Sequence, residues 1–257
     1  MSTRRQGERV LDRTVGSAHP TGMIELWNEI AGRAGVALSH LQTAQLDRYI
    51  TLLLEANKRM NLTRIPDRAT ADVAHVADAL TVLPHLPAGA HRLADVGSGG
   101  GVPGLVLASA RPDAQVFLIE STKKKAEFLR ETAAALDLAN VTVIADRAEA
   151  AGRGELRDSC DVVIARAVAA MTFLAEWCLP LVKKGGKFLA MKGAKIAEEL
   201  PEAQTAIRLL SGAPAVVHPV ELPGTEHHVI VEVVKIGRTP LDYPRDPTVA
   251  KGKAIGA

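Results

Sequence analysis

From residue 93 onward, short runs of apolar and β-branched residues alternate with segments of helical periodicity. The first five runs are LADV (93–96), QVFLIE (115–120), VTVIA (141–145), DVVIA (161–165) and GKFLAMKG (186–193). Between them, helical patterns are predicted near 104–110, 122–137 and 170–180. Strand and helix in turn predict a parallel sheet, because parallel neighbours need a crossover connection.

The last two apolar runs break this rhythm. They are APAVVHPVEL (213–222) and HHVIVEVVKI (227–236), and the few residues between them leave no room for a crossover helix. Two such runs are expected to pair as an antiparallel hairpin. The predicted fold is therefore α/β and Rossmann-like, with a seven-stranded, mainly parallel sheet that ends in an antiparallel hairpin.

The segment before the sheet has helical periodicity. Ser39 and Gln42 have the spacing of a capping box, which predicts a helix start. The apolar positions that follow are Leu46, Ile50, Leu53 and Leu54, and a second helical pattern runs through Val73, Val76, Ala77 and Leu80. The predicted organisation is a basic flexible tail (1–22), an N-terminal helical cap (23–90), a sheet domain (91–237) and a basic C-terminal tail (238–257).

The composition excludes several classes of protein. At 257 residues, 47% of them hydrophobic, the chain can bury a sizeable core. No apolar run reaches the roughly 18 residues that a membrane span requires, and residues 1–22 contain no apolar core of a secretory signal. The two cysteines, Cys160 and Cys178, lie in apolar segments, which argues against a disulfide framework. We expect a soluble protein of the reducing cytoplasm.

Five glycines lie in the stretch DVGSGGGVPG, which follows the first predicted strand. Without Cβ atoms, such a turn at the carboxyl end of a strand lets a ligand approach the main chain. The dinucleotide fingerprint GxGxxG fails because its third glycine would be Val102, whereas GxGxG fits Gly97, Gly99 and Gly101. Pro103 starts the next helix, and we expect the amino end of that helix to face an anionic group.

Carboxylates follow the next two predicted strands. Glu120 ends the second strand, where it can accept hydrogen bonds from both hydroxyls of a ribose. Residues 146–149 follow the third strand and can border an adenine. This local chemistry, which also assigns Asp95 and Gly99 to the site, favours a nucleoside ligand such as S-adenosyl-L-methionine. In the alternative interpretation, the glycines only form a tight turn and Glu120 is a surface acid.

Motifs spread over residues 40–251 resemble one bacterial family. They are NLTRI, HVADAL, DVGSGGGVPG, RPDAQVFLIESTKKKAEFLR, DRAEA, DVVIARAV, MKG, LPGTEHHVIV and YPR. The sequence is similar to the ribosomal RNA small subunit methyltransferase G family, also called glucose-inhibited division protein B. The resemblance implies a class I S-adenosylmethionine-dependent methyltransferase that acts on N7 of one guanine of 16S rRNA, guanine 527 in rRNA numbering.

The resemblance also implies which residues contact the cofactor. The positions that match the family's contacts are Gly97, Val102, Ala148, Glu149 and Arg166. The family commonly has aspartate where this chain has Glu120, so the carboxylate is kept.

The expected reaction needs no general base, because guanine N7 carries an exposed lone pair. We therefore assign no catalytic residue and expect catalysis by positioning. Arg166 is expected to bind the cofactor carboxylate or to direct the guanine; alternatively, it is a structural arginine paired with Asp161 or a loop carbonyl. His75 and Asp78 share one predicted helix face, where they line the site or form a packing pair.

Clusters of basic residues point to a polyanionic partner. The resemblance implies that this partner is 16S rRNA or the small ribosomal subunit. We expect a monomer with no membrane contact. We also expect no metal site, because His227 and His228 are adjacent on a strand and face opposite sides, so they cannot easily bind one ion. The alternatives are a class I methyltransferase of another substrate and an RNA-binding assembly factor with a vestigial cofactor pocket. The cations expected to meet RNA are Lys123, Lys124, Lys125, Lys192, Lys195, Arg245, Lys251 and Lys253.

Overall fold

The computed structural model describes residues 21–222, 225, 227–250 and 252–255. The basic tail expected at 1–22 falls almost entirely outside this range, as does Lys251.

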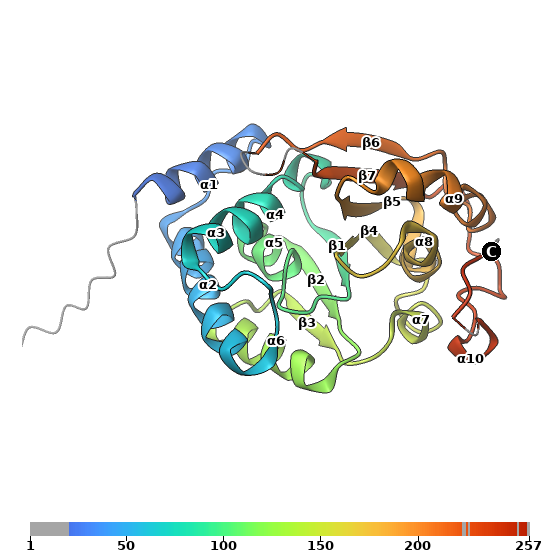
Figure 1. The fold of residues 1–257 in the computed structure, drawn as a ribbon, viewed down its shortest axis with the longest axis horizontal. Coiled ribbons are helices and arrows are strands. Elements are labelled where there is room, and N and C mark those ends of the chain that lie inside the picture. The colour runs from blue at the N-terminus through green and yellow to red at the C-terminus, as the bar shows by residue number, and fades with distance from the viewer. Residues whose placement is uncertain (1–20, 223–224, 226, 251, 256–257) are drawn as a thin grey trace, which may run out of the picture.

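The described residues form a seven-stranded sheet in the order β3-β2-β1-β4-β5-β7-β6 (Figure 1). Strands β1 to β5 pair in parallel, whereas β7 runs antiparallel to both β5 and β6. The predicted mainly parallel sheet with a terminal antiparallel hairpin is confirmed. The strands are β1 (His91–Val96), β2 (Ala114–Ile119), β3 (Val141–Ile144), β4 (Cys160–Arg166), β5 (Val182–Lys192), β6 (Val216–Pro219) and β7 (Val229–Val234).

Strand β1 lies between β2 and β4, and this pairing positions the site. The chain winds outward from β1 to β3, then returns across β1 to β4 and continues outward on the other side. The loops that leave the carboxyl ends of β1 and β4 therefore diverge, and open sheets bind ligands in the crevice that results.

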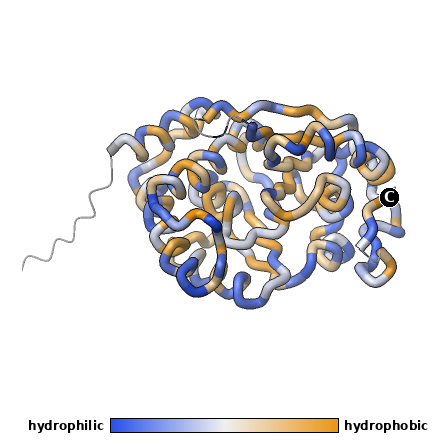
Figure 2. The backbone as a smooth tube through the Cα atoms, in the orientation of Figure 1, coloured by the Kyte–Doolittle hydropathy of each residue, from blue (hydrophilic) through white to orange (hydrophobic). Residues whose placement is uncertain are grey.

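Helices cover both faces of the sheet (Figure 1). One face packs against α5, α6 and the N-terminal helices, and the other against α8 and α9. Figure 2 shows hydrophobic colour concentrated along the central strands. The helices are α1 (Thr21–Arg33), α2 (His40–Met60), α3 (Arg68–Ala71), the π-helix η1 (Asp72–Ala77), α4 (Asp78–Leu80), η2 (Leu83–His85), α5 (Gly104–Ala110), α6 (Lys123–Ala135), α7 (Ala148–Ala151), α8 (Met171–Cys178), η3 (Leu179–Leu181), α9 (Ile196–Leu209) and α10 (Pro247–Ala250).

The capping box expected before α2 is present. The main-chain N–H of Ser39 donates to Gln42 Oε1 (2.8 Å), and that of Gln42 donates to Ser39 Oγ (3.3 Å). Gln42 Nε2 also donates to the carbonyl of Ser109 in α5 (2.9 Å), so the cap fixes α2 against the sheet domain. On the predicted apolar face, Leu46 and Ile50 are fully buried.

The sequence pattern does not predict helix α9. Its interior contains Pro201, which lacks the N–H for an intrahelical bond and normally signals a helix end. Its buried residues include the small Ala203 and Ala206, so the apolar periodicity is weak. Packing against α8 explains how the helix forms despite these local signals.

The basic segment after β7 packs against the sheet domain. The Arg157 guanidinium donates to the carbonyl of Tyr243 (2.6 Å), and Arg245 pairs with the buried Glu176 (2.6 Å). The free cysteines Cys160 and Cys178 are buried, and burial raises the pKa of the Cys160 thiol to about 11. Within the described part of the chain, no helix combines the length and apolarity needed to cross a bilayer.

Candidate functional site

A cleft of about 1060 Å³ opens at the carboxyl ends of β1, β2 and β4. We call it the glycine-loop cleft. Its lining includes the polar segment 61–65 that follows α2. Five of the predicted site residues line it together: Gly97, Gly99, Val102, Glu120 and Arg166.

The glycines of this loop are required by geometry. Gly97 has a φ of +73°, and a Cβ at this position would lie 2.7 Å from Val168 Cγ2. A Cβ at Gly104 would lie 2.3 Å from Leu118 Cδ2, because α5 starts directly against β2. The loop therefore presents bare main chain to the cleft at Gly97, and it packs tightly beneath at Gly104.

Glu120 holds the glycine loop from the neighbouring strand. Its Oε2 accepts from the N–H of Gly99 (3.0 Å) and its Oε1 from the N–H of Thr122 (2.7 Å). The side chain is buried, and a carboxylate keeps further lone pairs after two such bonds. Glu120 can therefore accept hydrogen bonds from a ligand without releasing the loop.

Asp95 has a supporting position beneath the loop. It is buried and is missing from the described lining of the glycine-loop cleft. Its Oδ2 accepts from the N–H of Gly104 (3.0 Å), and burial raises the pKa of its carboxyl to about 7. The expectation that the amino end of α5 faces an anionic ligand is wrong, because this carboxyl already takes its first N–H donor.

A second pocket, of about 170 Å³, adjoins the cleft beyond Gly97. We call it the Ala148 pocket. It contains the predicted residues Ala148 and Glu149 and shares Gly97, Ser121 and Val168 with the larger cleft. Apart from the buried Asp95, the predicted set is thus divided between two adjoining cavities that meet at Gly97.

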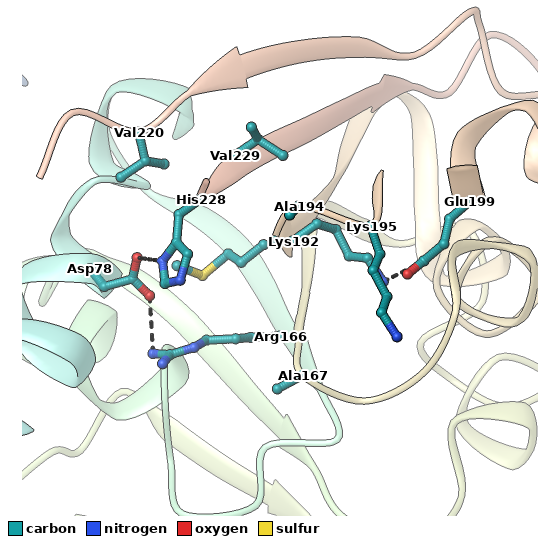
Figure 3. Close-up of a pocket in the computed structure, with 12 residues that line it drawn as sticks. Asp78, Arg166, Ala167, Lys192, Ala194, Lys195, Glu199, Val220, His228 and Val229 are labelled. Atoms are coloured by element: carbon teal, nitrogen blue, oxygen red, sulfur yellow. Dashed lines mark hydrogen bonds and ion pairs between the residues drawn. The ribbon is translucent and has the colours of Figure 1, made fainter. Parts of the chain in front are cut away.

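A third cavity, of about 380 Å³, shares Arg166 and Ala167 with the glycine-loop cleft. We call it the Asp78 pocket (Figure 3). Arg166 Nη1 lies 3.3 Å from Asp78 Oδ2, and Nη2 donates to the carbonyl of Ala74 in η1 (2.7 Å). The alternative of a structural arginine named Asp161 or a loop carbonyl as its partner. Asp161 is wrong, because its carboxylate pairs with Lys183 and accepts from the main chain of Arg92 at the amino end of β4, whereas a main-chain carbonyl, that of Ala74, does accept from Arg166.

His75 was expected either to line the site or to form a packing pair, and the segment 61–65 was given no place in the site; both line the glycine-loop cleft. Thr63 Oγ1 lies 2.9 Å from His75 Nε2. Burial, together with the nearby Arg166 charge, lowers the pKa of His75 to about 4. The π-helical turn that carries His75 is a geometry often found at functional sites, but no sequence pattern announces it.

The expected RNA-contacting cations differ in their surroundings. Lys123 to Lys125 begin α6, and Lys125 lines the glycine-loop cleft. Lys195 is exposed at the Asp78 pocket. Lys192 is bound to Glu199 (2.6 Å), and Arg245 is bound to Glu176, so both side chains already have carboxylate partners.

Two groups of histidines in the described residues bear on the expectation of no metal. His228 Nδ1 lies 3.1 Å from Asp78 Oδ1, whereas the neighbouring His227 is exposed. Elsewhere, ligand atoms of His85, His218 and Glu232 lie within 4.8 Å of one another. The ammonium of Lys187 is 3.1 Å from this Glu232 carboxylate, so a cation already balances its charge.

Comparison with known proteins identifies the family. A sequence model described as rRNA small subunit methyltransferase G matches residues 42–229. The chain is 41% identical to Ribosomal RNA small subunit methyltransferase G of Staphylococcus epidermidis, over 87% of this chain and 95% of the relative. It is 44% identical to the protein of that name from Roseiflexus castenholzii, over 84% and 93% of the two chains.

Among solved structures, a SAM-dependent methyltransferase from Aquifex aeolicus has a similar fold. The TM-score is 0.52 at 15% identity, over 68% of this chain and 97% of the other. This likeness concerns the fold alone. The family-model match and the identities to full-length relatives show that the chain belongs to the rRNA small subunit methyltransferase G family.

Proposed function

We propose that this rRNA methyltransferase transfers the methyl group of S-adenosyl-L-methionine to N7 of guanine 527 of 16S rRNA. Family membership supports rRNA as the substrate class. The observation that carries the proposal is the cleft at the ends of β1, β2 and β4, where Glu120 binds the glycine loop at Gly99 and keeps acceptor capacity.

The residues of the cleft suit an adenosyl ligand. The bare main chain at Gly97 gives room for close approach, and the Glu120 carboxylate can accept from two ribose hydroxyls. Ala148 and Glu149 line the pocket into which an adenine would extend. We assign cofactor contacts to Gly97, Gly99, Val102, Glu120, Ala148, Glu149 and Arg166, and to Asp95 a contact through the loop that it supports.

The chain's contribution to the reaction is positioning. When bound, S-adenosyl-L-methionine supplies an electrophilic methyl group. The guanine N7 lone pair forms a bond to this methyl carbon while the carbon–sulfur bond breaks, and the electron pair of that bond leaves with S-adenosyl-L-homocysteine. N7 loses no proton, so no general base is assigned. His75, uncharged at neutral pH because its pKa is about 4, lines the cleft without repelling a positively charged sulfonium. The main effect is to hold the two reacting atoms in line, about 3–3.5 Å apart.

We further propose that the enzyme acts in the cytoplasm, as a monomer, on the small ribosomal subunit. Aromatic residues form only 3% of the chain, and Phe173 and Trp177 face one another with ring centroids 5.7 Å apart. Stacking platforms for unpaired bases are therefore scarce. A substrate with a defined RNA fold would present the guanine instead.

The test uses methyl-labelled S-adenosyl-L-methionine and small subunits that lack the modification. We expect one label per subunit, mapped to N7 of guanine 527, and none on subunits already methylated there. Label at another nucleotide, or equal labelling of short single-stranded RNA, would contradict the proposal.

A further inference from the structure

The Asp78 pocket adjoins the glycine-loop cleft at the carboxyl ends of the central strands. Strands β4 and β5 end at Arg166 and Lys192, and the antiparallel β7 begins at Val229, so all three meet at one edge of the sheet. Arg166 and Ala167 belong to both this pocket and the glycine-loop cleft. A group in the pocket can therefore face the cleft directly, and about 380 Å³ is within the range of small-ligand sites.

One wall of the pocket combines a buried acid, Asp78, with a partly buried base, Arg166. The Asp78 side chain is only 3% exposed, and its two oxygens lie near His228 Nδ1 (3.1 Å) and Arg166 Nη1 (3.3 Å). Arg166 Nη1 is itself buried and has no hydrogen-bond acceptor in good geometry. Figure 3 shows these three side chains grouped together, across from Lys192 and Lys195. A ligand that fits this wall would supply an acceptor oxygen to Arg166 and N–H donors to the spare lone pairs of Asp78.

Guanine carries the complementary groups in the matching order. Its O6 is an acceptor next to N7, and its N1–H and N2–H groups are donors on the far side of O6. Arg166 also lines the glycine-loop cleft, whereas Asp78 does not. With O6 at Arg166 and the donors at Asp78, the N7 side of the base is therefore the side nearer that cleft. Adenine would place an N1 lone pair against the carboxylate and an amino group against the guanidinium, so the same wall would repel it.

The other residues that line the pocket are compatible with one purine base. Met191 and Val220 are buried and apolar, which suits the flat faces of a purine. Lys192 is held by Glu199 and by the carbonyl of Ala169 (3.1 Å), so its charge is already paired. Lys195 is exposed and can meet a backbone phosphate outside the pocket.

We infer that the Asp78 pocket is the binding site of the target guanine, with Asp78 accepting from N1–H and N2–H and Arg166 donating to O6. The inference rests on the proposed function. His228, whose side chain is 40% exposed, satisfies one oxygen of Asp78 until the base replaces it. The carboxylate thus has a partner in both states, which limits the cost of burying it.

The experiment measures methylation rates on small subunits reconstituted with 16S rRNA that carries guanine or adenine at the target. We expect the wild type to prefer guanine by about 100-fold or more, since a site built for specific hydrogen bonds rejects the wrong partner strongly. Asp78→Asn should lower the guanine rate by about 10- to 100-fold and shrink the preference, because an amide can pair with adenine. Asp161→Asn, the same change at the amino end of β4, should alter neither the guanine rate nor the preference for guanine.

Calorimetry with S-adenosyl-L-methionine separates the possible failures. Asp78→Asn should keep its cofactor affinity, because Asp78 does not line the glycine-loop cleft and the amide oxygen can still face Arg166 Nη1. Equal loss on both bases with unchanged cofactor affinity would overturn the inference, and no transfer by the wild type would instead overturn the proposed function. If Asp78→Asn does not fold, Asp78→Glu retains the carboxylate and must retain the guanine preference; loss of that preference overturns the inference as well.

Discussion

The glycine-loop cleft and the Asp78 pocket meet at the carboxyl end of β4 but are built differently. The cleft presents main chain from a glycine loop, and at Gly97 there is no space for a Cβ. The pocket presents polar and charged side chains from three distant segments, including Asp78, Arg166 and His228. The first should therefore be sensitive to added atoms, and the second to changes of charge.

This difference separates two kinds of recognition within one reaction. A main-chain surface binds by shape, and it offers N–H and C=O groups that substitution cannot remove. A buried network of charged side chains distinguishes ligands by their donors and acceptors, because each unmatched group is costly there. Each prediction below would break or sharpen this contrast.

The largest effect is expected from Gly97→Ala. The new Cβ would lie 2.7 Å from Val168 Cγ2, at a φ of +73°. Pushing Val168 away changes the wall shared by the glycine-loop cleft and the Ala148 pocket. We expect the affinity for S-adenosyl-L-methionine, measured by calorimetry, to fall at least about 100-fold by analogy with displaced positioning groups.

Gly185→Ala provides the matched control. Gly185 also has a positive φ (+83°), but a Cβ there meets nothing within 4 Å. Both variants should lose about 1–2 kcal/mol of stability from the left-handed backbone, and only Gly97→Ala should lose cofactor affinity. Equal affinities in the two variants would show that the cleft does not depend on the close approach at Gly97.

The contrast also explains what the sequence could predict. The glycine loop and Glu120 lie within one strand-helix-strand stretch, where the pattern of strands fixes which loop ends meet. Their positions in the cleft follow from local signals such as GxGxG. Asp95 shows the limit of this reasoning, because only the packing of α5 reveals that its carboxyl faces Gly104 rather than the cleft.

The Asp78 pocket could not be assembled from the sequence in the same way. Asp78 and Arg166 are 88 positions apart, and their pairing depends on how the N-terminal helices dock on the sheet. Asp161 was an equally reasonable partner by sequence, but it lies at the other end of β4. The missed α9 has the same cause, since tertiary contacts with α8 outweigh the local signal of Pro201.

A smaller effect is expected from Glu120→Gln. The carboxylate accepts from the N–H groups of both Gly99 and Thr122. An amide has only one oxygen, so its NH₂ group would face one of these two donors. Together with a weakened ribose contact, this should reduce cofactor affinity about 10-fold, the usual scale for a hydrogen bond to a charged group. Glu127→Gln, on the exposed side of α6, is the control and should bind normally. Normal binding by Glu120→Gln would remove this carboxylate from the site.

A still smaller effect is expected from Lys195→Ala, which tests the charged rim of the Asp78 pocket. Removing one phosphate-contacting cation should reduce the salt dependence of subunit methylation by about one unit of log–log slope. Lys183→Ala, at the opposite edge of the sheet beside Asp161, should leave the slope unchanged. Methylation assays over a series of KCl concentrations measure both slopes. An unchanged slope for Lys195→Ala would place the RNA on another face.

The smallest effect concerns Asp95, the support beneath the glycine loop. Burial raises the pKa of its carboxyl from 3.8 to about 7 in the folded protein, so the folded state binds more protons than the unfolded state between these values. The stability from this group is present below the unfolded pKa and is lost as pH rises through about 7. Asp95→Asn keeps an acceptor for the Gly104 N–H but does not titrate, so its melting temperature should decline less between about pH 5 and pH 8.

The cofactor affinity of Asp95→Asn then decides whether this residue only supports the start of α5 or also contacts the cofactor. A residue that only holds the start of α5 can be replaced by an isosteric acceptor, so calorimetry should give the wild-type affinity. If the affinity falls while melting keeps the wild-type pH dependence, the carboxylate contacts the cofactor in ionised form, and recognition in the glycine-loop cleft depends on charge as well as shape. In that case the two cavities would differ in the number of charged groups they use, and the contrast between main-chain and side-chain recognition would no longer hold.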